Sequence, residues 1–503
     1  MSKTIIIIGA GLAGLSAALQ AAENGCNVKL VSSLPSERAQ SVMAEGGINA
    51  ALNTKDENDS PEEHFTDTIK AACGLADQNA VWGMTQAAPE LVHWLLKLGV
   101  KFNMSGYDDV DLRNFGGQKK KRTAFAQSDT GKQIMTAMID AVRRKEASGM
   151  VERFSNHSFL TLRLCGNICC GCVIRDEYSQ ETVELPGDAV IVATGGMHGL
   201  FGNTTGSLSN TGEVTAELFR LGVPLANGEM IQYHPTTVKC GGKRMLISEA
   251  ARGEGGRLFA MKDGKQWYFM EEKYPELGNL MPRDITAREI WKVSHESEVF
   301  LDMTEILDEI ISNKLSGLAD DCMTYLHKDI RKEPVSVLPG IHYFMGGILV
   351  DEQHRTPIQN LCAAGECCAQ YHGANRLGGN SLLGALYGGR VAAKSACEQA
   401  DVVDLSCATQ IDFPPASQIS EIKQLNKVMQ ETMGVVRNEN TLLNGIQTVQ
   451  ALTGNLPLLG MAVLKSALAR KESRGAHWRE DYPKSNDDDY LKTTVARFDG
   501  KQI

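Results

Sequence analysis

Three glycines near the start of the chain have the spacing that binds the pyrophosphate of a dinucleotide. They are Gly9, Gly11 and Gly14, and the residues between them include Leu12 and Ala13. Gly9 permits a tight turn, Gly11 lets the backbone approach the phosphates, and Gly14 lets a helix pack closely on a strand. The amino end of that helix then stabilises the phosphate charge. The pattern predicts a nucleotide cofactor where a strand precedes the glycines and a helix follows them.

The flanking sequence supplies both elements. Residues 4–8 form an apolar run with the length of a buried parallel strand, and a helical pattern extends from Leu15 to Gly25. Residues 27–32 predict the next strand, which completes a βαβ unit. Ser32 ends this strand where an acidic residue usually binds the ribose, so these residues alone leave FAD and NAD open.

The chain has 13 cysteines, an odd number scattered along its length, which is not the pattern of a disulfide framework. Four of them gather in one run, namely Cys165, Cys169, Cys170 and Cys172. A zinc or iron–sulfur site needs paired thiolates from separated loops, whereas this run alternates with apolar residues and glycines. We therefore expect a β-hairpin without a metal, in a reducing cytoplasm that suits all the thiols.

Size, charge and hydropathy limit the class of protein. A chain of 503 residues exceeds one hydrophobic core, so two or three domains are expected. The net charge of −10 argues against nucleic-acid binding but allows a local pocket for an anionic substrate. Glycines interrupt the apolar start after Ile5–Ile8, so no signal peptide is expected, and no apolar stretch of about 20 residues predicts a membrane span.

The texture of the sequence changes several times along the chain. An α/β pattern extends over residues 1–225 and returns, rich in glycine, over 341–414. Residues 226–340 are more charged, with longer helices and fewer apolar strands, and predict an inserted domain. Residues 415–503 are mainly helical and then polar. The predicted order is a dinucleotide domain, an insertion, the dinucleotide domain resumed and a helical C-terminal domain.

Twelve short blocks resemble, in the same order, the flavoprotein subunits of succinate dehydrogenases and fumarate reductases. The blocks begin at Ala44, Phe115, Arg122, Asp129, Ala193, His234, Arg252, Pro282, His342, Gly365, His372 and Ser473. The resemblance covers nearly the whole chain. It implies an α/β fold with a Rossmann-like FAD-binding domain, an inserted α+β capping domain and a C-terminal helical domain. In this family the second strand commonly ends without an acid, so Ser32 fits.

The resemblance implies a set of FAD contacts. Glu213 replaces a family Asp, and Glu366 corresponds to the acid that holds a ribose hydroxyl. The full set is Gly9, Gly11, Leu12, Ala13, Gly14, Ser32, Gln40, Ser41, Glu45, Gly46, Gly47, Gly195, Glu213, Glu366, Ser381 and Leu382. Members with covalent flavin carry a His where this chain has Gln40, and glutamine has no ring nitrogen to bond the flavin. Noncovalent FAD is therefore expected.

The resemblance also implies a C4 dicarboxylate substrate, which needs two anion sites. Arginine suits each site because its fork meets a carboxylate bidentately. Arg283 and Arg376 are the implied arginines, and His234, His342 and Ser248 are further donors, with Ser248 replacing a family Thr.

The implied reaction interconverts fumarate and succinate, which makes the chain an FAD-dependent oxidoreductase acting on CH–CH bonds. Flavin N5 gives hydride to one alkene carbon and Arg283 gives a proton to the other. Arginine is nearly always protonated, so the role needs a relay that returns the proton. Glu249 and Arg252 match that relay.

Two other activities stay open. L-Aspartate oxidase is a close relative with noncovalent FAD, and its family places a Glu before the Gly-Gly of the loop where this chain has Phe115. An unpaired buried ammonium costs several kcal/mol, which favours fumarate. The second is a soluble reductase of another α,β-unsaturated carboxylate. A flavoprotein that only transfers electrons is not expected to keep the Arg and His set.

The C-terminal segment Arg474–His477 resembles members that dock an iron–sulfur subunit. Such a subunit is the partner that the resemblance implies, although the sequence does not name the electron donor. The expected location is the cytoplasm, with peripheral attachment to the cytoplasmic membrane through partner subunits as the alternative.

Overall fold

A five-stranded parallel sheet organises the first part of the chain in the computed structural model, which describes residues 2–106, 109–399, 413 and 418–503. Its strands, in spatial order, are β20 (Leu361–Ala363), β10 (Ala189–Val192), β1 (Thr4–Ile8), β2 (Asn27–Ser32) and β6 (Val151–Ser155). The predicted βαβ unit is present, because α1 (Leu12–Glu23) joins β1 to β2. The strand from residue 361 shows that the sheet resumes after the insertion, as the sequence predicts.

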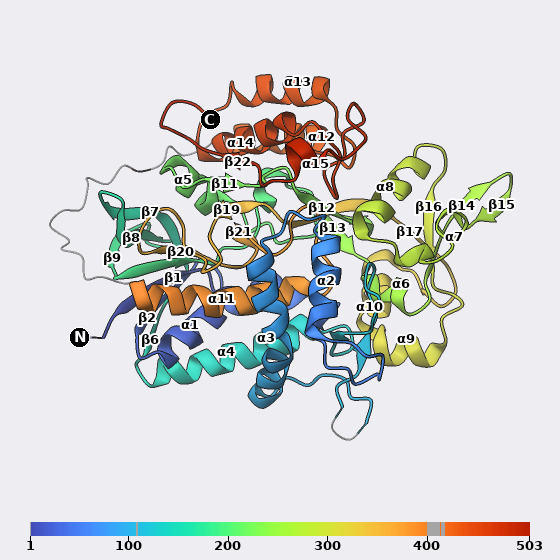
Figure 1. Cartoon of the computed structure of the whole chain (residues 1–503), viewed down its shortest axis with the longest axis horizontal. Helices are drawn as coiled ribbons and strands as arrows, with labels where there is room; N and C mark the ends of the chain where they lie inside the picture. Colours follow the sequence, from blue (N-terminus) through green and yellow to red (C-terminus); the bar gives the residue numbers. More distant parts are fainter. Residues whose placement is uncertain (1, 107–108, 400–412, 414–417) are drawn as a thin grey trace.

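Alternate residues of β1 face two different layers. Ile5 and Ile7 pack with α1, α4 (Thr130–Ala147) and α11 (Asn380–Gln399), whereas Ile6 and Ile8 pack against an antiparallel sheet. That sheet consists of β7 (His157–Cys165), β8 (Ile168–Asp176) and β9 (Thr182–Pro186). Figure 1 shows the helices on one side of the strands and β7–β9 on the other. Both faces of the parallel sheet are covered, which explains the apolar runs Ile5–Ile8 of β1 and Ala189–Val192 of β10.

The cysteine run forms the predicted hairpin of β7 and β8. Eleven cysteines of the described residues have free thiols. Cys165 differs from the expectation because it is disulfide-bonded. The described residues contain no group of His, Cys, Asp and Glu that could hold a metal ion.

Further elements of the first part surround the parallel sheet. α2 (Pro61–Ala71) begins after Ser60, whose side chain accepts from Glu63 N, and Pro61 occupies the first helical position, where its missing N–H has no cost. The others are α3 (Gln78–Leu98), α5 (Glu213–Arg220), and a small sheet of β3 (Ile48–Asn49), β5 (Thr123–Ala124) and β4 (Leu112–Arg113).

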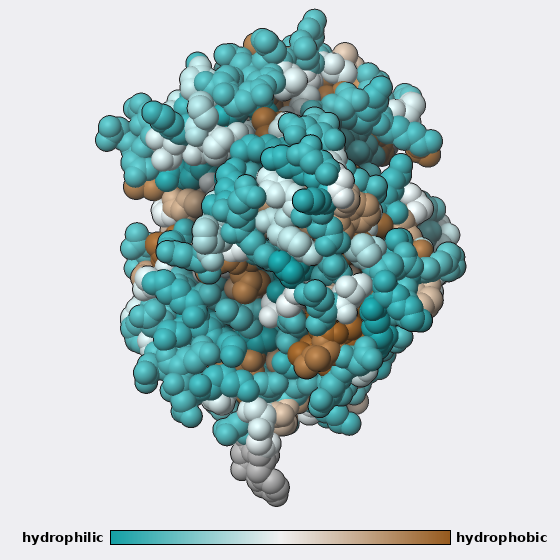
Figure 2. Space-filling view, turned by 90° about the vertical axis from the view of Figure 1, so that its right-hand side faces the viewer, coloured by the Kyte–Doolittle hydropathy of each residue, from teal (hydrophilic) through white to brown (hydrophobic). Residues whose placement is uncertain are grey.

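The inserted region combines two antiparallel sheets with helices of at most 11 residues, so it has shorter helices and more strands than the texture of the sequence predicts. One sheet pairs β12 (Ile231–Cys240) with β13 (Lys243–Leu246) and β18 (Leu338–Phe344). The second has the order β15 (Lys265–Trp267), β14 (Arg257–Lys262), β16 (Val299–Asp302) and β17 (Val335–Ser336). The helices are α6 (Glu249–Gly253), α7 (Phe269–Lys273), α8 (Arg283–Val293), α9 (Asp308–Lys314) and α10 (Ser316–Asp321). The charged surface residues concealed the alternation of short amphipathic strands. Figure 2 shows that the face on this side is largely hydrophilic, with apolar residues in small groups.

The C-terminal region is helical, as predicted. It contains α12 (Ile419–Thr432), α13 (Glu439–Val449), α14 (Asn455–Ala469) and the short α15 (Asp487–Tyr490). It joins the rest through a mixed sheet of β21 (Cys368–Ala369), β19 (Gly347–Leu349), β11 (Leu225–Ala226) and β22 (Val495–Ala496). The domain limits at 225/226, 340/341 and 414/415 stay predictions, and the last lies outside the described residues. No helix among the described residues has the length and apolar character that crossing a bilayer requires.

Candidate active site

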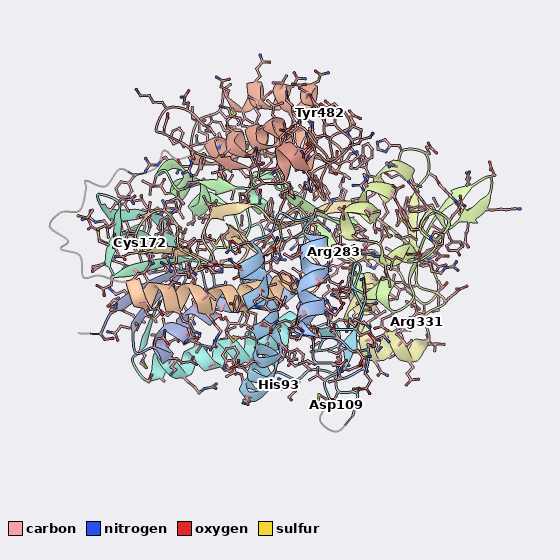
Figure 3. All side chains as sticks on the ribbon, viewed as in Figure 1. His93, Asp109, Cys172, Arg283, Arg331 and Tyr482 are labelled. Atoms are coloured by element: carbon pink, nitrogen blue, oxygen red, sulfur yellow. The ribbon has the colours of Figure 1, made fainter. Side chains whose placement is uncertain are left out.

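A cavity of about 640 Å³ lies between the parallel sheet and the inserted region. Arg283 stands near the middle of the molecule, where these parts meet (Figure 3). Most predicted cofactor and substrate residues line this cavity. The exceptions are Gly14 and Arg252, which lie behind its wall.

The glycine motif forms one end of the cavity. Gly9 has φ of +109°, and a Cβ there would lie 2.3 Å from the carbonyl oxygen of Ala193. A Cβ at Gly14 would lie 1.8 Å from Gly9 O, so this glycine lets α1 approach the turn. A Cβ at Gly11 would meet only Ser41 Oγ at 3.6 Å and Ala39 Cβ at 3.9 Å, which leaves the backbone of Gly11 open toward the cavity. Leu12 and Ala13 line the cavity beside it, at the amino end of α1.

Three polar side chains face the cavity near this end. Ser32 Oγ, at the end of β2, is buried without a hydrogen-bond partner among the described residues. Glu213 is the first residue of α5, and burial raises the pKa of its carboxyl. Glu366 Oε1 accepts from Phe344 N at 3.0 Å and lies 3.6 Å from His198 Nε2. Gly195, also in the wall, has φ of +75°.

The segment that follows β2 forms a second wall. Gln40 and Ser41 belong to a short 3-10 turn, and Leu12 N donates to Ser41 Oγ at 3.3 Å. Glu45 Oε2 is buried without a hydrogen-bond partner in the described part of the chain. Burial, together with the charges of Asp321 and Asp129, raises the pKa of Glu45 to about 8. Glu45 is therefore mostly protonated at neutral pH.

An apolar and backbone surface separates the two ends of the cavity. Phe115 is 2% exposed, and its ring lies where a Cβ on Gly46 would meet it at 2.8 Å. Gly47 lies directly behind, because a Cβ there would be 2.5 Å from Ala124 O. Ser381 and Leu382, in the first turn of α11, complete this surface.

These features fit an elongated dinucleotide with a flat ring. The motif around Gly11 leaves room for a pyrophosphate at a helix amino terminus, and the unpartnered Ser32 hydroxyl and the Glu366 carboxylate suit sugar hydroxyls. The apolar surface of Phe115 and Leu382 suits a ring system. Gln40 lines the cavity and offers no nucleophilic ring nitrogen.

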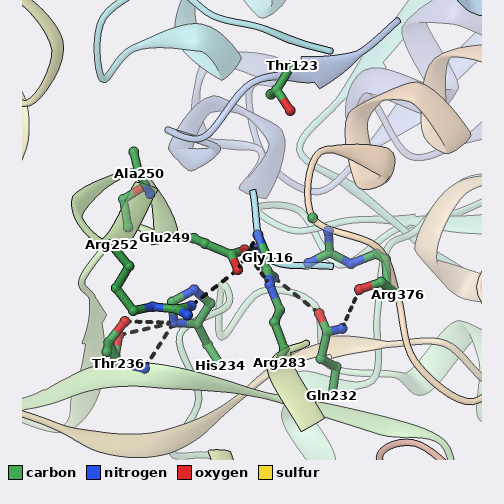
Figure 4. Close-up of polar contacts among 12 residues, drawn as sticks. Gly116, Thr123, Gln232, His234, Thr236, Glu249, Ala250, Arg252, Arg283 and Arg376 are labelled. Atoms are coloured by element: carbon green, nitrogen blue, oxygen red, sulfur yellow. Dashed lines mark hydrogen bonds and ion pairs between the residues drawn. The ribbon is translucent and has the colours of Figure 1, made fainter. Parts of the chain in front are cut away.

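The opposite end of the cavity is dominated by one buried carboxylate. Glu249 Oε2 accepts from Arg283 Nη2 at 2.6 Å and from Nε at 2.8 Å, while Oε1 accepts from Arg252 Nη2 at 3.2 Å (Figure 4). Gly116 N also donates to Oε1 at 3.2 Å. Burial alone would raise the pKa of Glu249, but the charges of Arg283 and Arg252 outweigh it and lower this pKa. Glu249 is therefore ionised, and it joins both arginines.

Two histidines face this cluster from adjacent strands. The rings of His234 and His342 are 5.2 Å apart between centroids. His342 Nδ1 bonds the Thr205 hydroxyl at 2.8 Å, and His234 Nδ1 lies 3.1 Å from Thr236 O, which leaves both Nε2 atoms for a ligand. Burial, and then the charge of Arg283, lower the pKa of both rings well below the ordinary value. Both are neutral hydrogen-bonding groups at pH 7.

Arg376 and Ser248 complete the polar end. Arg376 is 3% exposed, lies over the Tyr343 ring at 4.3 Å, and has no ion pair among the residues that the structure describes. Burial and the nearby charge of Arg283 lower the pKa of Arg376 to about 9, so it stays charged at neutral pH. Its Nε is buried without a hydrogen-bond partner in the same described set. Ser248 caps α6 just before Glu249.

Two residues that the sequence prediction missed hold this site together. Gln232 Oε1 accepts from Arg283 Nη1 at 3.2 Å, and its Nε2 donates to Arg376 O at 2.8 Å. It stands two positions before His234 on β12, so the two-residue repeat of a strand was a usable signal. Thr205, which orients His342, lies in a loop and gave no such signal.

Two family models match the chain. One, described as an FAD binding domain, matches residues 4–382, and the other, described as the C-terminal part of the fumarate reductase flavoprotein, matches 452–503. The chain is 39% identical to the succinate dehydrogenase flavoprotein subunit of Bacillus subtilis, over 98% of this chain and 94% of that protein. It is 33% identical to the 8-methylmenaquinol:fumarate reductase flavoprotein subunit of Wolinella succinogenes, over 99% and 89%.

The fold agrees with these sequences. A structure of FrdA from E. coli quinol fumarate reductase superposes with a TM-score of 0.90 at 28% identity, covering 100% of this chain and 95% of that one.

Proposed function

This chain belongs to the flavoprotein family of succinate dehydrogenases and fumarate reductases, and from this premise we propose that it interconverts fumarate and succinate with noncovalently bound FAD. One observation carries the proposal. Arg283, Arg252 and Arg376 are all buried at one end of the cavity, where Glu249 forms ion pairs with Arg283 and Arg252 and none with Arg376. This uncompensated positive charge suits a dianion.

We assign the following roles to the residues of this site. Arg376 and the neutral rings of His234 and His342 hold the carboxylates of the substrate. FAD, when bound, supplies the hydride chemistry at one alkene carbon. Arg283 holds a proton beside the other carbon, and Glu249 bonds both Arg283 and Arg252, so it is placed to restore that proton. A guanidinium aimed at developing carbanion charge also contributes about 10²–10³ in rate through electrostatics.

Phe115 supports a dicarboxylate rather than an amino acid as substrate. Its ring fills the space between Gly46 and Gly378, and no carboxylate projects from this loop position to pair with an ammonium. A buried ammonium left without a partner costs several kcal/mol. L-Aspartate is therefore disfavoured at this site.

The test uses purified, FAD-loaded protein and compares three substrates. With reduced viologen we expect rapid consumption of fumarate and slow consumption of an unsaturated monocarboxylate such as acrylate. With L-aspartate and oxygen we expect little peroxide. Fast aspartate oxidation without fumarate turnover would identify an L-aspartate oxidase, and equal rates with acrylate would identify a reductase of broader specificity. The Arg331→Gln variant serves as a control, because Arg331 does not line the cavity.

Noncovalent attachment is tested separately. Acid precipitation should release yellow FAD into the supernatant, because Gln40 offers no histidyl nitrogen for a bond to the flavin. Flavin that stays with the denatured pellet would contradict this part of the proposal while leaving the reaction intact.

We further propose an iron–sulfur partner subunit, and a cytoplasmic location either free or peripheral at the membrane. The names of the relatives describe flavoprotein subunits, which supports a multi-subunit assembly. The segment Arg474–His477 does not itself offer a docking surface, since Arg474 is 7% exposed and His477 is fully buried. Purification from the native cell should recover an iron-containing second chain, and recovery of this chain alone would contradict the partner.

A further inference from the structure

Arg244, a residue of β13, lines the same cavity and takes no part in the site described above. Its Nη1 donates to Thr237 Oγ1 at 3.1 Å. Among the described residues, no carboxylate lies within ion-pair distance of Arg244. The wall of the cavity therefore contains, besides Arg376, a further arginine that forms no ion pair with an acid of the described chain.

The side chain is fixed rather than loose. It passes over Gly340, where a Cβ would lie 2.5 Å from Arg244 Cδ. The arginine is half-buried, and burial lowers the pKa of its guanidinium. Partial desolvation of a charge that has no acid partner is unfavourable, and an anion bound beside Arg244 would offset that cost.

Its position places it beside the substrate-binding histidines. Gly340, which lies under Arg244, pairs with His234 across β12 and β18. Arg244 N donates to Thr204 O at 3.2 Å, and the hydroxyl of the next residue, Thr205, is hydrogen-bonded to His342 Nδ1. Lys243, the exposed neighbour of Arg244, also lines the cavity. Positive charge thus extends from solvent at Lys243 to the histidines.

We propose that Arg244 is an entry residue, which attracts a carboxylate of the incoming dianion and passes it to His234 and His342. This rests on the proposed dicarboxylate substrate. A dianion approaches a chain with net charge −10 against repulsion, and a local positive mouth overcomes it by focusing the field. Arg244 raises the association rate, whereas Arg376 holds the bound substrate.

The experiment measures the association of malonate, a dicarboxylate that cannot react, with the oxidised, FAD-loaded protein. Flavin absorbance in a stopped-flow instrument gives the association and dissociation rates. In Arg244→Gln at about 20 mM ionic strength, we expect association to slow about fivefold and dissociation to change less than about twofold. At about 300 mM the difference from wild type should shrink below about twofold, because salt screens the charge.

Two matched variants separate charge from packing. Arg244→Lys keeps the charge and should keep most of the association rate, whereas Arg331→Gln removes a charge outside the cavity and should behave as wild type. The proposal would be overturned if Arg244→Gln bound malonate as fast as wild type at low salt. It would also be overturned if the association rate fell by the same factor at high salt. Wild-type protein that binds malonate but does not turn over fumarate would refute the proposed reaction alone. Wild-type protein that binds no dicarboxylate would overturn both.

Discussion

Buried arginines gather in two places in this protein, and the two clusters differ in their balance of charge. The C-terminal cluster is closed by acids. It consists of Arg470, Arg474 and Arg479 with Glu229, Glu472, Asp481 and Asp487. Arg470 lies 2.6 Å from Glu229 and 2.7 Å from Glu472, and all three side chains are at most 1% exposed. The cavity cluster instead sets three arginines around Glu249.

This difference separates a structural role from a binding role. Each of the three arginines of the C-terminal cluster forms an ion pair with at least one of its four acids, so this cluster needs no ligand to balance its charge and fixes the chain against the rest of the molecule. In the cavity cluster, Arg283 and Arg252 share one carboxylate and Arg376 has none among the described residues, so its positive charge is unbalanced until an anion binds. Burial of an arginine does not by itself tell a structural role from a binding role. The number of acidic partners does tell them apart.

The largest expected effect is on the rate after Arg283→Gln. Turnover should fall by at least about 10³, because the variant loses both the proton and the charge beside the reacting carbon. Binding of malonate, followed by flavin absorbance, should weaken less than about tenfold. A variant that keeps more than about a tenth of the wild-type rate, a loss below about 1.4 kcal/mol, would remove Arg283 from its role.

The balanced cluster should respond in stability instead. Arg470→Met leaves Glu229 and Glu472 buried with one cation fewer, and should cost about 3–5 kcal/mol, or roughly 3–5 °C in Tm for a chain of this length. The kcat of the folded protein should stay within about twofold of wild type. Thermal unfolding and steady-state kinetics measure both, and unchanged Tm would contradict the structural role.

Arg376→Gln should lower the rate less than Arg283→Gln does, and it should not destabilise the protein as Arg470→Met does. Binding of malonate and kcat/KM for fumarate should each fall by about 10², since a clamp serves bound substrate and transition state alike. Tm without substrate should stay equal or rise, because a surplus buried charge is removed. A fall in Tm as large as that of Arg470→Met would make the two clusters alike and contradict the comparison.

Glu45 gives the smallest effect and shows how a buried acid behaves where no arginine forms an ion pair with it. Its folded pKa of about 8 lies above the ordinary value of 4.5, so the folded state binds the proton more tightly. The resulting stability is complete below about pH 4.5 and is lost as pH rises through about 8. The Tm of wild type minus that of Glu45→Gln should therefore fall as the pH rises from about 4.5 to about 8 and level off above it. A constant difference over that range would contradict the raised pKa.

The sequence predicted the elements whose local pattern decides their structure. The apolar run at residues 4–8 and the glycines after it specify a strand, a turn and a helix, and the cysteine run forms its hairpin. Arg283, Glu249 and Arg376 were found by resemblance to matching blocks. The inserted region was harder, because short strands such as β16 carry too few residues to show a two-residue repeat clearly. Arg244 was missed because its role depends on Gly340, almost a hundred positions away.

Strands β12 and β18 lie side by side where the chain enters and leaves the inserted region. Arg283 and Glu249 belong to the segment between those strands, whereas Arg376 comes from the chain that follows β18. In the proposed function, a dicarboxylate held by Arg376 also lies against Arg283 beside its reacting carbon, so the bound substrate joins the two segments on either side of β12 and β18. A monocarboxylate of similar size has one anionic group only, so it cannot bind both segments through carboxylates. Under the proposed function, the site therefore favours a substrate that reaches both segments.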